Sequence, residues 1–461
     1  MTDWTPDPLL LSRPAYLSLA EQFVRAIESG LLSPGTRLIP HRRLADDLGL
    51  STQTVSRAYE ELSRRGLIAG EIGRGSFVLR SGQEVQQPYL PERMGELIDL
   101  SILKPVTETM HLERLRAGFG WLAENLSSLS ALSFRPNNVL PRHRVVASDW
   151  LARGGVEVAP TNILITNGAT AAITAALMGV VRTGAALAVE SLTHHTLMPL
   201  CTYLGVHLEG VDMDGEGMVP AALDELCRRV AIRAIFLQPS IINPLAAMMG
   251  PDRRAELVAV ARRHDLAIIE NDILNVMVPD RPAPFVTLAP ERVLHINGFT
   301  KITVPGLRLA YLTAPDRYVA AVANRHLVSN WMVTPPMVEL LSHWLTDGTA
   351  QELILWQRRA IADRHLVAQE MLAGLPYLAH SHSLHVWLPL PEGRDEADFV
   401  QECRLRGVAV AAGTAFRATE RQKRDAVRIS LCSSRVEELR AGLGVVGSIL
   451  RESPEALLAP I

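Results

Sequence analysis

A lysine at the end of an apolar strand is the residue of this chain best suited to chemistry. Only three of the 461 residues are lysines, against 43 arginines, and Lys301 closes an apolar run that begins at Arg292. A desolvated lysine loses its proton easily and its neutral amine can form a Schiff base with an aldehyde, whereas a guanidinium stays charged. The alternative is a lysine that snorkels from a strand end. We take Lys301 as the candidate aldehyde-binding residue.

Two features of the same region could hold a phosphate as parts of one site with this lysine. A Gly turn joins an apolar strand to a helix, and backbone N–H groups at a helix N-terminus bind anions. The residues of that turn are Gly168, Ala169 and Thr170. Arg308 follows Lys301 by seven residues, across a Pro-Gly turn. Its guanidinium suits a phosphate bidentately.

Other polar residues that could contact a ligand lie at the ends of apolar runs or in a later predicted strand. Asn243 follows one apolar run and could donate to a phenolate, and Asn271 and Asp272 end the next. Arg428, far along the chain, could clamp a carboxylate. Each of these residues taken alone is more often structural, but their order favours one shared site.

The elements that must position these residues are strands and helices in alternation. Short apolar runs begin at Ile163, Ala186, Ile235, Leu266, Val293 and Leu309. They predict an α/β fold with a mainly parallel sheet covered on both faces. Ligands of such sheets bind at the carboxyl ends of the strands. We expect a smaller α+β lobe over about residues 346–461.

The first 80 residues have another pattern. Helical spacing of apolar residues predicts three short helices, with Gly49 and the N-cap candidate Ser51 between the second and third, as in a helix-turn-helix. A tip at residues 73–75 predicts a small β-wing. Polar side chains on the outer face of the third helix could contact bases and phosphates. These are Thr52, Gln53, Ser56 and Arg57. A small helical interaction module is the alternative.

Composition limits the class of protein. A hydrophobic content of 48%, a charged content of 21% and a net charge of -3 are those of a soluble globular chain without a global polyanion-binding surface. Four scattered cysteines suggest neither a disulfide framework nor a zinc site, so we expect no metal. No signal peptide or membrane span is recognisable. We therefore expect a cytoplasmic protein that makes no use of a membrane.

The first domain closely resembles the GntR-type winged helix-turn-helix. The resemblance rests on the runs at residues 17–22, 30–38, 43–62 and 66–78. It implies that Arg37, Arg42 and Arg43 hold phosphates of double-stranded DNA and that Arg74 lies on the wing. It also implies that the helix Ser51 to Arg64 enters the major groove, and its candidate contact residues are Ser51, Thr52, Gln53, Thr54, Ser56 and Arg57.

Residues 98–461 resemble the fold-type I aminotransferases, which bind pyridoxal 5′-phosphate (PLP). Joined to a GntR-type domain, they resemble the MocR-like transcriptional regulators. By this resemblance Lys301 forms the Schiff base, and Arg308 with the Gly168–Thr170 turn binds the phosphate. Asn243 meets the ring oxygen, and His194 takes the place of the aromatic residue that stacks on the ring. Arg428 binds the carboxylate of an amino compound. The resemblance also places Asn271, Asp272 and Thr300 at the cofactor and implies a homodimer.

The chain departs from that pattern where catalysis is concerned. Asn271 aligns with the acid that family members aim at the pyridine nitrogen, and an amide cannot stabilise a pyridinium as a carboxylate does. A one-residue shift would use Asp272 instead. Other departures are Ile273 and Leu274 for a tyrosine, Gly298 for a hydroxyl residue, Leu245-Ala246 for Thr-Gly, and Phe134 for a tyrosine. Transamination should therefore be slowed.

The predicted organisation is a DNA-binding domain at residues 1–80, a linker at 81–97 and an aminotransferase-like domain at 98–461. The preferred function is a DNA-binding regulator that senses PLP, or an adduct of PLP with an amino compound, with vestigial catalysis. An active aminotransferase with an appended DNA-binding domain is the alternative. A third reading is a regulator that has lost the cofactor and binds another ligand in the pocket.

Overall fold

The computed structural model describes most of the chain in two compact units, Met1–Leu90 and Pro91–Ile461. The described residues are 4–28, 31–32, 36–64, 67–71, 75–78, 97–132, 134, 140–419, 425–433 and 435–452. The linker predicted at 81–97 lies outside them except for its last residue. None of the described helices combines the length and the hydropathy of a membrane span.

The first unit is a helix-turn-helix followed by a two-stranded sheet. Its elements are η1 (Pro8–Leu10), α1 (Ala15–Glu28), α2 (His41–Leu48), α3 (Thr52–Arg64), β1 (Ile68–Glu71) and β2 (Gly75–Val78). Gly49 ends α2 in the left-handed region at φ 64°, which glycine adopts without strain. The Ser51 hydroxyl accepts the backbone N–H of Thr54 at 3.1 Å, as an N-cap does. Because β1 and β2 pair antiparallel, the predicted helices and wing strands are all present.

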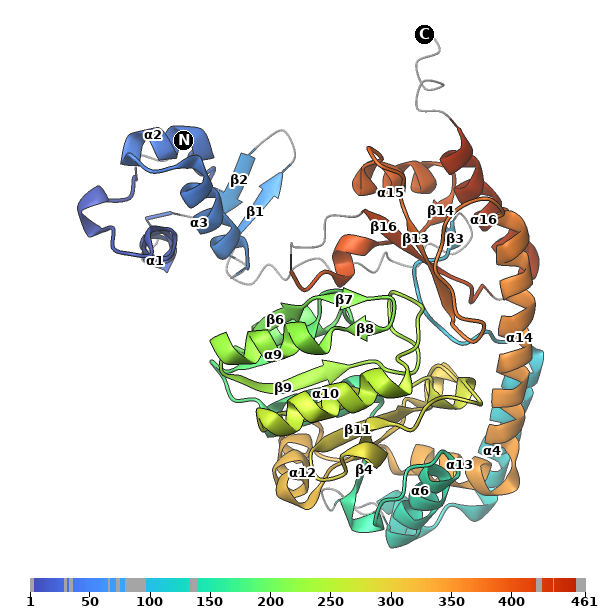
Figure 1. Ribbon diagram of the computed structural model, residues 1–461. Coiled ribbons are helices and arrows are strands. Elements are labelled where there is room, and N and C mark those ends of the chain that lie inside the picture. The colour runs from blue at the N-terminus through green and yellow to red at the C-terminus, as the bar shows by residue number, and fades with distance from the viewer. Residues whose placement is uncertain are drawn as a thin grey trace. The chain divides into compact units, whose positions relative to one another are not determined.

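A seven-stranded sheet forms the centre of the large lobe of the second unit (Figure 1). Its strand order is β4 (Ile163–Thr166), β12 (Ala310–Thr313), β11 (Val293–Gly298), β10 (Ala267–Asn271), β9 (Ile232–Leu237), β5 (Ala186–Glu190) and β6 (His207–Val211). Only β12 runs antiparallel to its neighbours. The predicted mainly parallel sheet is confirmed, and β5, β10 and β11 are buried along their whole length because helices cover both faces.

The helices divide between the two faces of the sheet. One face packs on α7 (Ala169–Val180), α8 (Leu197–Leu204) and α12 (Asp316–Asn330). The other packs on α6 (Pro141–Arg153), α10 (Pro251–Arg263), α11 (Phe285–Leu288), α13 (Pro335–Asp347) and the first half of α14 (Thr349–Met371). The remaining elements of this lobe are α4 (Thr109–Asn125), α5 (Ser128–Leu132), η2 (Pro160–Asn162), β7 (Met213–Asp214), β8 (Gly217–Met218), α9 (Pro220–Arg229), η3 (Asn275–Met277) and η4 (Pro305–Leu307).

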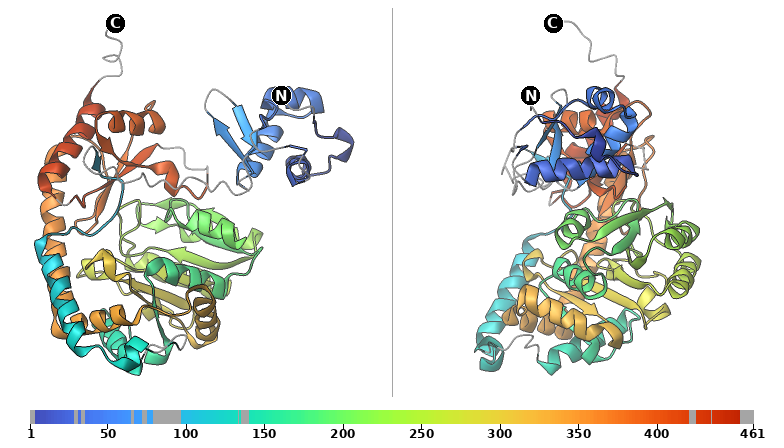
Figure 2. Two further views of the ribbon diagram at one scale, coloured as in Figure 1. Left: turned by 180° about the vertical axis from the view of Figure 1, so that it is seen from behind. Right: turned by 90° about the vertical axis from the view of Figure 1, so that its left-hand side faces the viewer.

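The small lobe is a three-stranded antiparallel sheet with helices. Its elements are β13 (His385–Pro389), α15 (Glu396–Leu405), β14 (Val408–Ala409), β15 (Ala411–Ala412), η5 (Gly413–Phe416), β16 (Ala426–Ser430) and α16 (Val436–Arg451). The helix α14 runs along both lobes, orange in Figure 2, because its first half packs in the large-lobe core and Val367 and Ala368 pack in the small-lobe core. The segment β3 (Ile98–Asp99) pairs with β14, so the start of this unit joins the small lobe, which the periodicity did not predict.

Candidate cofactor site

Strand register brings the candidate residues to one edge of the sheet. Gly298 at the end of β11 pairs with Ala310, and Ala310 pairs with Thr166 at the end of β4. The end of β10 lies beside β11 through the pair of Asn271 and Ile296. The carboxyl ends of the parallel strands therefore share this edge, where ligands of such folds bind. Lys301 follows β11 by three residues.

The Gly turn and Arg308 form an anion cradle. Gly168 caps α7 at φ 86°, and a Cβ there would lie 3.3 Å from the Nη2 atom of Arg308. The amides of Ala169 and Thr170 stand in the first turn of α7, where backbone N–H groups have no partner within the helix. Arg308 and Thr170 are exposed. A cationic guanidinium against free amides at the positive end of a helix dipole suits a phosphate.

Lys301 is half-buried and makes no hydrogen bond or ion pair with any residue that the structure describes. Burial, and next the Arg428 guanidinium, lower the pKa of its amine to about 8, while Cys432 acts weakly in the opposite direction. A fraction of the amine is therefore neutral near pH 7. The neighbouring Thr300 has a buried hydroxyl without a hydrogen-bond partner. An uncompensated amine of this kind is a competent nucleophile for an aldehyde.

Asn271 and Asp272 lie on opposite faces of the sheet. Side chains alternate along β10: Ile268 packs in the core with α10, and Ile269 packs in the core with α7. Asn271 therefore shares the α7 face with the anion cradle, and its buried Oδ1 atom has no hydrogen-bond partner. Asp272 follows β10 and pairs with groups on the other face.

Asp272 belongs to a buried ionic cluster. Its Oδ2 atom lies 3.3 Å from Arg281 Nη1 and 3.5 Å from His295 Nε2. Burial alone would raise the pKa of Asp272, but His295 and Arg281 hold it below its ordinary value. The nearby Glu270 accepts the backbone N–H groups of Phe285 and Val286. The carboxylate of Asp272 thus pairs with Arg281 and His295.

Two departures from the family pattern form one packing unit. A Cβ at Gly298 would stand 3.0 Å from Cγ2 of Ile273 and 3.7 Å from Cβ of Ala169. The branched Ile273 takes the room that a larger residue 298 would need, so each substitution fits the other. Ala246 keeps a left-handed backbone, φ 56°, at the position where family members have glycine. Ala246 therefore adopts a backbone conformation that favours glycine.

Arg428 joins the two lobes at Asn243. Its Nη1 atom donates to Oδ1 of Asn243 at 3.0 Å, its Nη2 atom donates to the carbonyl of Ser101, and its guanidinium lies 4.7 Å from the ring centre of Phe416. Arg428 is only 3% exposed. It is a fixed positive charge beside the amine of Lys301, suited to a ligand carboxylate.

His194 is half-buried and stacks on His195 at a ring separation of 4.7 Å. Burial, and then His195, Lys301 and Arg428, hold the pKa of His194 well below its ordinary value. Burial, Arg428 and Lys301 lower the pKa of His195 to about 3. Both imidazoles are therefore neutral near pH 7. A neutral, flat ring is what stacking on another ring requires.

Sequence reasoning missed His385, Ser240 and Leu103, which line a small cavity together with the predicted residues Lys301, Asn243, Asn271 and Asp272. The cavity is about 10 Å³, room for one water. His385 Nε2 lies 3.0 Å from the carbonyl of Pro244. No sequence motif marks these residues, because only tertiary packing brings the small lobe to this place.

The residues at this edge suit a phosphate-bearing aldehyde with an aromatic ring. Lys301 offers a neutral amine, the Gly168 turn and Arg308 offer an anion cradle, and Asn271 offers an orphan buried amide oxygen. A carboxylate partner for a ring nitrogen is the one element that Asn271 does not supply.

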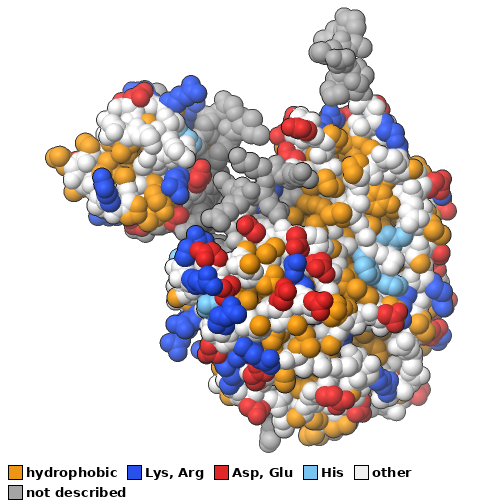
Figure 3. Space-filling view, in the orientation of Figure 1, with side chains coloured by type: hydrophobic (Ala, Val, Ile, Leu, Met, Phe, Trp, Pro, Cys, Tyr) orange, Lys and Arg blue, Asp and Glu red, His pale blue; other side chains and the backbone are white. Residues whose placement is uncertain are grey.

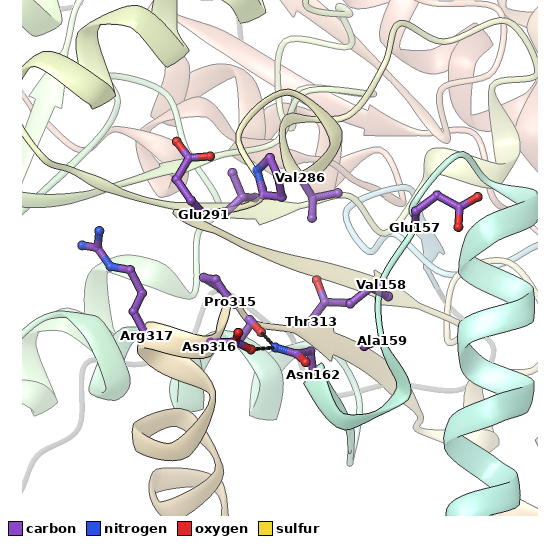
Figure 4. A pocket seen from close by; sticks show the side chains of 13 residues that line it. Glu157, Val158, Ala159, Asn162, Val286, Glu291, Thr313, Pro315, Asp316 and Arg317 are labelled. Carbon is purple, nitrogen blue, oxygen red and sulfur yellow. Dashed lines mark hydrogen bonds between the residues drawn. The ribbon is translucent and has the colours of Figure 1, made fainter.

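A different cavity, of about 470 Å³, lies where β11 begins and β12 ends. Figure 4 shows Glu157, Glu291 and Asp316 around it, with Arg317 at one side. It therefore stands at the strand edge opposite Lys301. Its carboxylates do not suit a phosphate, so it does not compete as the cofactor site.

Some of the predicted DNA-contact side chains have partners within the domain, and others have none among the described residues. Among the described residues, Arg37, Arg42, Thr52 and Gln53 are exposed without side-chain partners, and exposed Arg43 has only a 3.9 Å contact with Asp47. The others also have roles within the fold: the hydroxyls of Ser51 and Thr54 bond each other at 2.8 Å, Ser56 bonds His41 at 3.1 Å, and Arg57 lies over the ring of Tyr16 at 5.0 Å. Arg74 lies outside the described residues.

Residues 124–446 match the family of aminotransferases of class I and II. The chain belongs to this family. Residues 15–78 match the bacterial regulatory proteins of the gntR family. This aminotransferase-family chain thus carries a GntR-type DNA-binding domain, the architecture of the MocR-like transcriptional regulators that the sequence resemblance predicted, and it is a regulator of that type.

Relatives named as HTH-type transcriptional regulators match most of this chain. The uncharacterized HTH-type transcriptional regulator YdeF of Bacillus subtilis is 27% identical over 97% of this aminotransferase-family chain and 96% of its own length. The pyridoxine biosynthesis regulator PdxR of Corynebacterium glutamicum is 27% identical over 78% of this chain and 79% of its own. An archaeal alanine:glyoxylate aminotransferase superposes with a TM-score of 0.72 and 23% identity, covering 78% of this chain and 91% of that one. The superposition confirms the predicted fold class.

Proposed function

We propose that this regulator binds PLP at Lys301 and senses the cofactor, or its adduct with an amino compound, with catalysis reduced to a remnant. The observation that carries the proposal is an amine of pKa about 8, without an ion-pair partner among the described residues, at the same sheet edge as the cradle of Gly168 and Arg308. The relative PdxR is named for pyridoxine biosynthesis, which supports a vitamin B6 compound as the ligand.

Each residue would have a defined task toward PLP. The amine of Lys301 would hold the aldehyde carbon, and the amides of Ala169 and Thr170 with Arg308 would hold the phosphate. Asn243 would meet the ring oxygen, and Arg428 would orient the carboxylate of an amino compound. Bound PLP supplies an electron sink, whose strength depends on a proton at its ring nitrogen.

The uncharged side chain of Asn271 is the reason that we propose sensing rather than turnover. The amide of Asn271 can hydrogen-bond a ring nitrogen but carries no charge to hold a proton there. Asp272 is held on the other face by Arg281 and His295. The alternative of an active aminotransferase requires conversion of an amino donor and a keto acid by the PLP-loaded protein, and we expect that conversion to be absent.

A second copy of the chain is the proposed partner of the cofactor site. Large apolar side chains are exposed near it: Phe134 is 78% exposed and rests on Trp331, and Val328 is 81% exposed. Asn167 in the Gly turn donates to the carbonyl of Met332, next to that patch. Exposed apolar patches of this kind mark association surfaces, which supports a homodimer.

DNA is the proposed target of the GntR-type domain, with the exposed Thr52 and Gln53 reading bases and Arg37, Arg42 and Arg43 holding phosphates. The face of the molecule drawn in Figure 3 mixes basic and acidic side chains, and the net charge of the chain is -3. DNA attraction would therefore be local to the first unit.

The test is an absorption spectrum of the purified protein with and without PLP. We expect PLP to produce a new absorption band and a borohydride-reducible link at Lys301, both lost in Lys301→Ala. Lys104→Ala is the matched control, because it removes one of the other two lysines. A wild-type spectrum unchanged by PLP would contradict the proposal and favour a regulator that uses the pocket for another ligand.

A further inference from the structure

A third cavity, of about 400 Å³, lies behind the end of β10. Its walls are the end of α6, the segment after β10 and the helix α14, and Figure 1 draws this yellow segment beside orange α14. Its polar lining consists of Arg153, Asn275, Arg281, Gln351 and Arg358, and the lining includes no aspartate or glutamate. Three arginines without a carboxylate among them form a basic cavity of the size of small-molecule sites.

Several donors that line this cavity have no partner within the described residues. Arg153 is exposed and makes no hydrogen bond or ion pair there. Arg358 donates from Nε and Nη2 to the carbonyl of Val276, which fixes the guanidinium and leaves Nη1 without a bond. Asn275 is 3% exposed; its Oδ1 atom accepts the backbone N–H of Val276, and its Nδ2 atom makes no bond. The Nδ2 atom of Asn275 is therefore a donor that a ligand in the cavity could use.

Arg281 connects this cavity with the cofactor edge. Its Nη2 atom donates to the carbonyl of Gly154 at 2.8 Å, and its Nη1 atom faces Asp272 at 3.3 Å. Asp280 acts on Arg358 from outside the lining, opposing the burial that lowers the pKa of that guanidinium. Neither carboxylate lines the cavity, so its positive charge is not neutralised from within.

We propose that this cavity binds a small organic oxyanion, a carboxylate or a phosphate ester, through Arg153, Arg358 and the Nδ2 atom of Asn275. Guanidinium groups pair with planar oxyanions bidentately, and a charged acceptor strengthens each hydrogen bond. Trp150 and the prolines of residues 279–284 supply an apolar wall for the body of the ligand. The site is separate from Lys301 and does not depend on PLP.

The test is calorimetric titration of the full-length chain with two probes, succinate and inorganic phosphate. We expect at least one probe to bind, and its Kd to rise about tenfold or more in Arg153→Gln and in Arg358→Gln, because each loses a charge-assisted pair. Arg182→Gln is the matched control, because Arg182 is exposed and unpaired among the described residues but lies elsewhere. Arg281 is left intact because its loss would strand the buried Asp272.

Two further variants show whether a probe binds at the cofactor edge instead of this cavity. Arg308→Gln removes the guanidinium of the Gly168 cradle, and Lys301→Ala removes the amine. Both variants should bind the probe at this cavity as the wild type does, so a failure of PLP binding leaves this proposal standing. No binding of either probe to the wild type would overturn it. Binding that is lost in Arg308→Gln but kept in Arg153→Gln and Arg358→Gln would overturn it too.

Discussion

The guanidinium of Arg308 lies against Gly168, so close that a Cβ at residue 168 would stand 3.3 Å from Nη2. Residue 168 also has a backbone, φ 86° and ψ 172°, that side chains rarely adopt. Both constraints act at the turn that we propose holds a phosphate.

Gly168→Ala should therefore destabilise the fold by about 1–3 kcal/mol through backbone strain and also weaken PLP binding by displacing Arg308. Gly184→Ala is the matched control: Gly184 has φ 79° and open space around its Cα. Gly184→Ala should lower the stability of the fold through backbone strain and leave the PLP affinity unchanged. Thermal unfolding and PLP titration measure the two effects, and an equal PLP affinity in both variants would count against the cradle.

The rate at which PLP attaches to Lys301 should rise with pH through a midpoint near 8. Burial and Arg428 lower the amine pKa to about 8, so the folded protein holds more neutral amine near neutrality than an ordinary lysine of pKa 10.5 would. We expect attachment about tenfold slower at pH 7 than on the plateau above pH 9. Stopped-flow absorbance measures the profile. A midpoint near 10.5 would show that the amine is solvated.

Asn271→Asp should strengthen PLP binding and weaken the protein without PLP. A carboxylate on the α7 face could hold a proton on the ring nitrogen, but without the ligand it is a buried charge near Asp272. Asn297→Asp is the control, because Asn297 is equally buried on β11 but follows His295 on the opposite face. It should destabilise without improving PLP affinity. Tm with and without PLP separates the two, and equal Tm changes in both variants would refute the assignment of Asn271.

Glu190 should make stability fall as pH rises. Its carboxyl is fully buried, and burial raises its pKa from 4.5 to about 8 although the backbone of Met218 acts in the opposite direction. Between these values the folded state binds the extra proton, so its stability decreases with pH and levels off above 8. Glu190→Gln should remove about 3 kcal/mol of this loss between pH 4.5 and 7. Denaturant unfolding against pH checks it, with exposed Glu392→Gln expected to follow the wild type.

In the DNA-binding domain, base and phosphate contacts should respond differently to salt. The DNA is an operator sequence selected in vitro with the wild-type protein. Gln53→Ala should reduce the affinity for it about tenfold and leave unchanged the slope of log affinity against log salt concentration. Arg43→Ala should reduce the steepness of that slope by about one. Arg57→Ala should lower stability as well, because Arg57 lies over Tyr16. Fluorescence anisotropy at several salt concentrations measures this. A Gln53→Ala protein with wild-type affinity would contradict base recognition by α3.

Much of the architecture could be predicted from the chain alone, because it depends on local patterns. Apolar runs marked the strands that end at Thr166, Asn271 and Gly298, and the Gly49 break with the Ser51 cap marked the helix-turn-helix. The order of the Gly168 turn, Asn243, Asn271, Lys301 and Arg308 along the chain indicated the family. Strands, caps and turns depend on neighbours in the sequence, which is why periodicity reveals them.

Tertiary structure alone decided which side of the sheet each residue serves. A shift of one residue moves a side chain to the other face, so the sequence left Asn271 and Asp272 as alternatives, and the structure pairs Asp272 with Arg281 and His295. The fit of Ile273 to Gly298 and the pairing of β3 with β14 likewise join segments far apart in the chain. Such contacts leave no periodic trace, because they depend on where folding brings distant residues together.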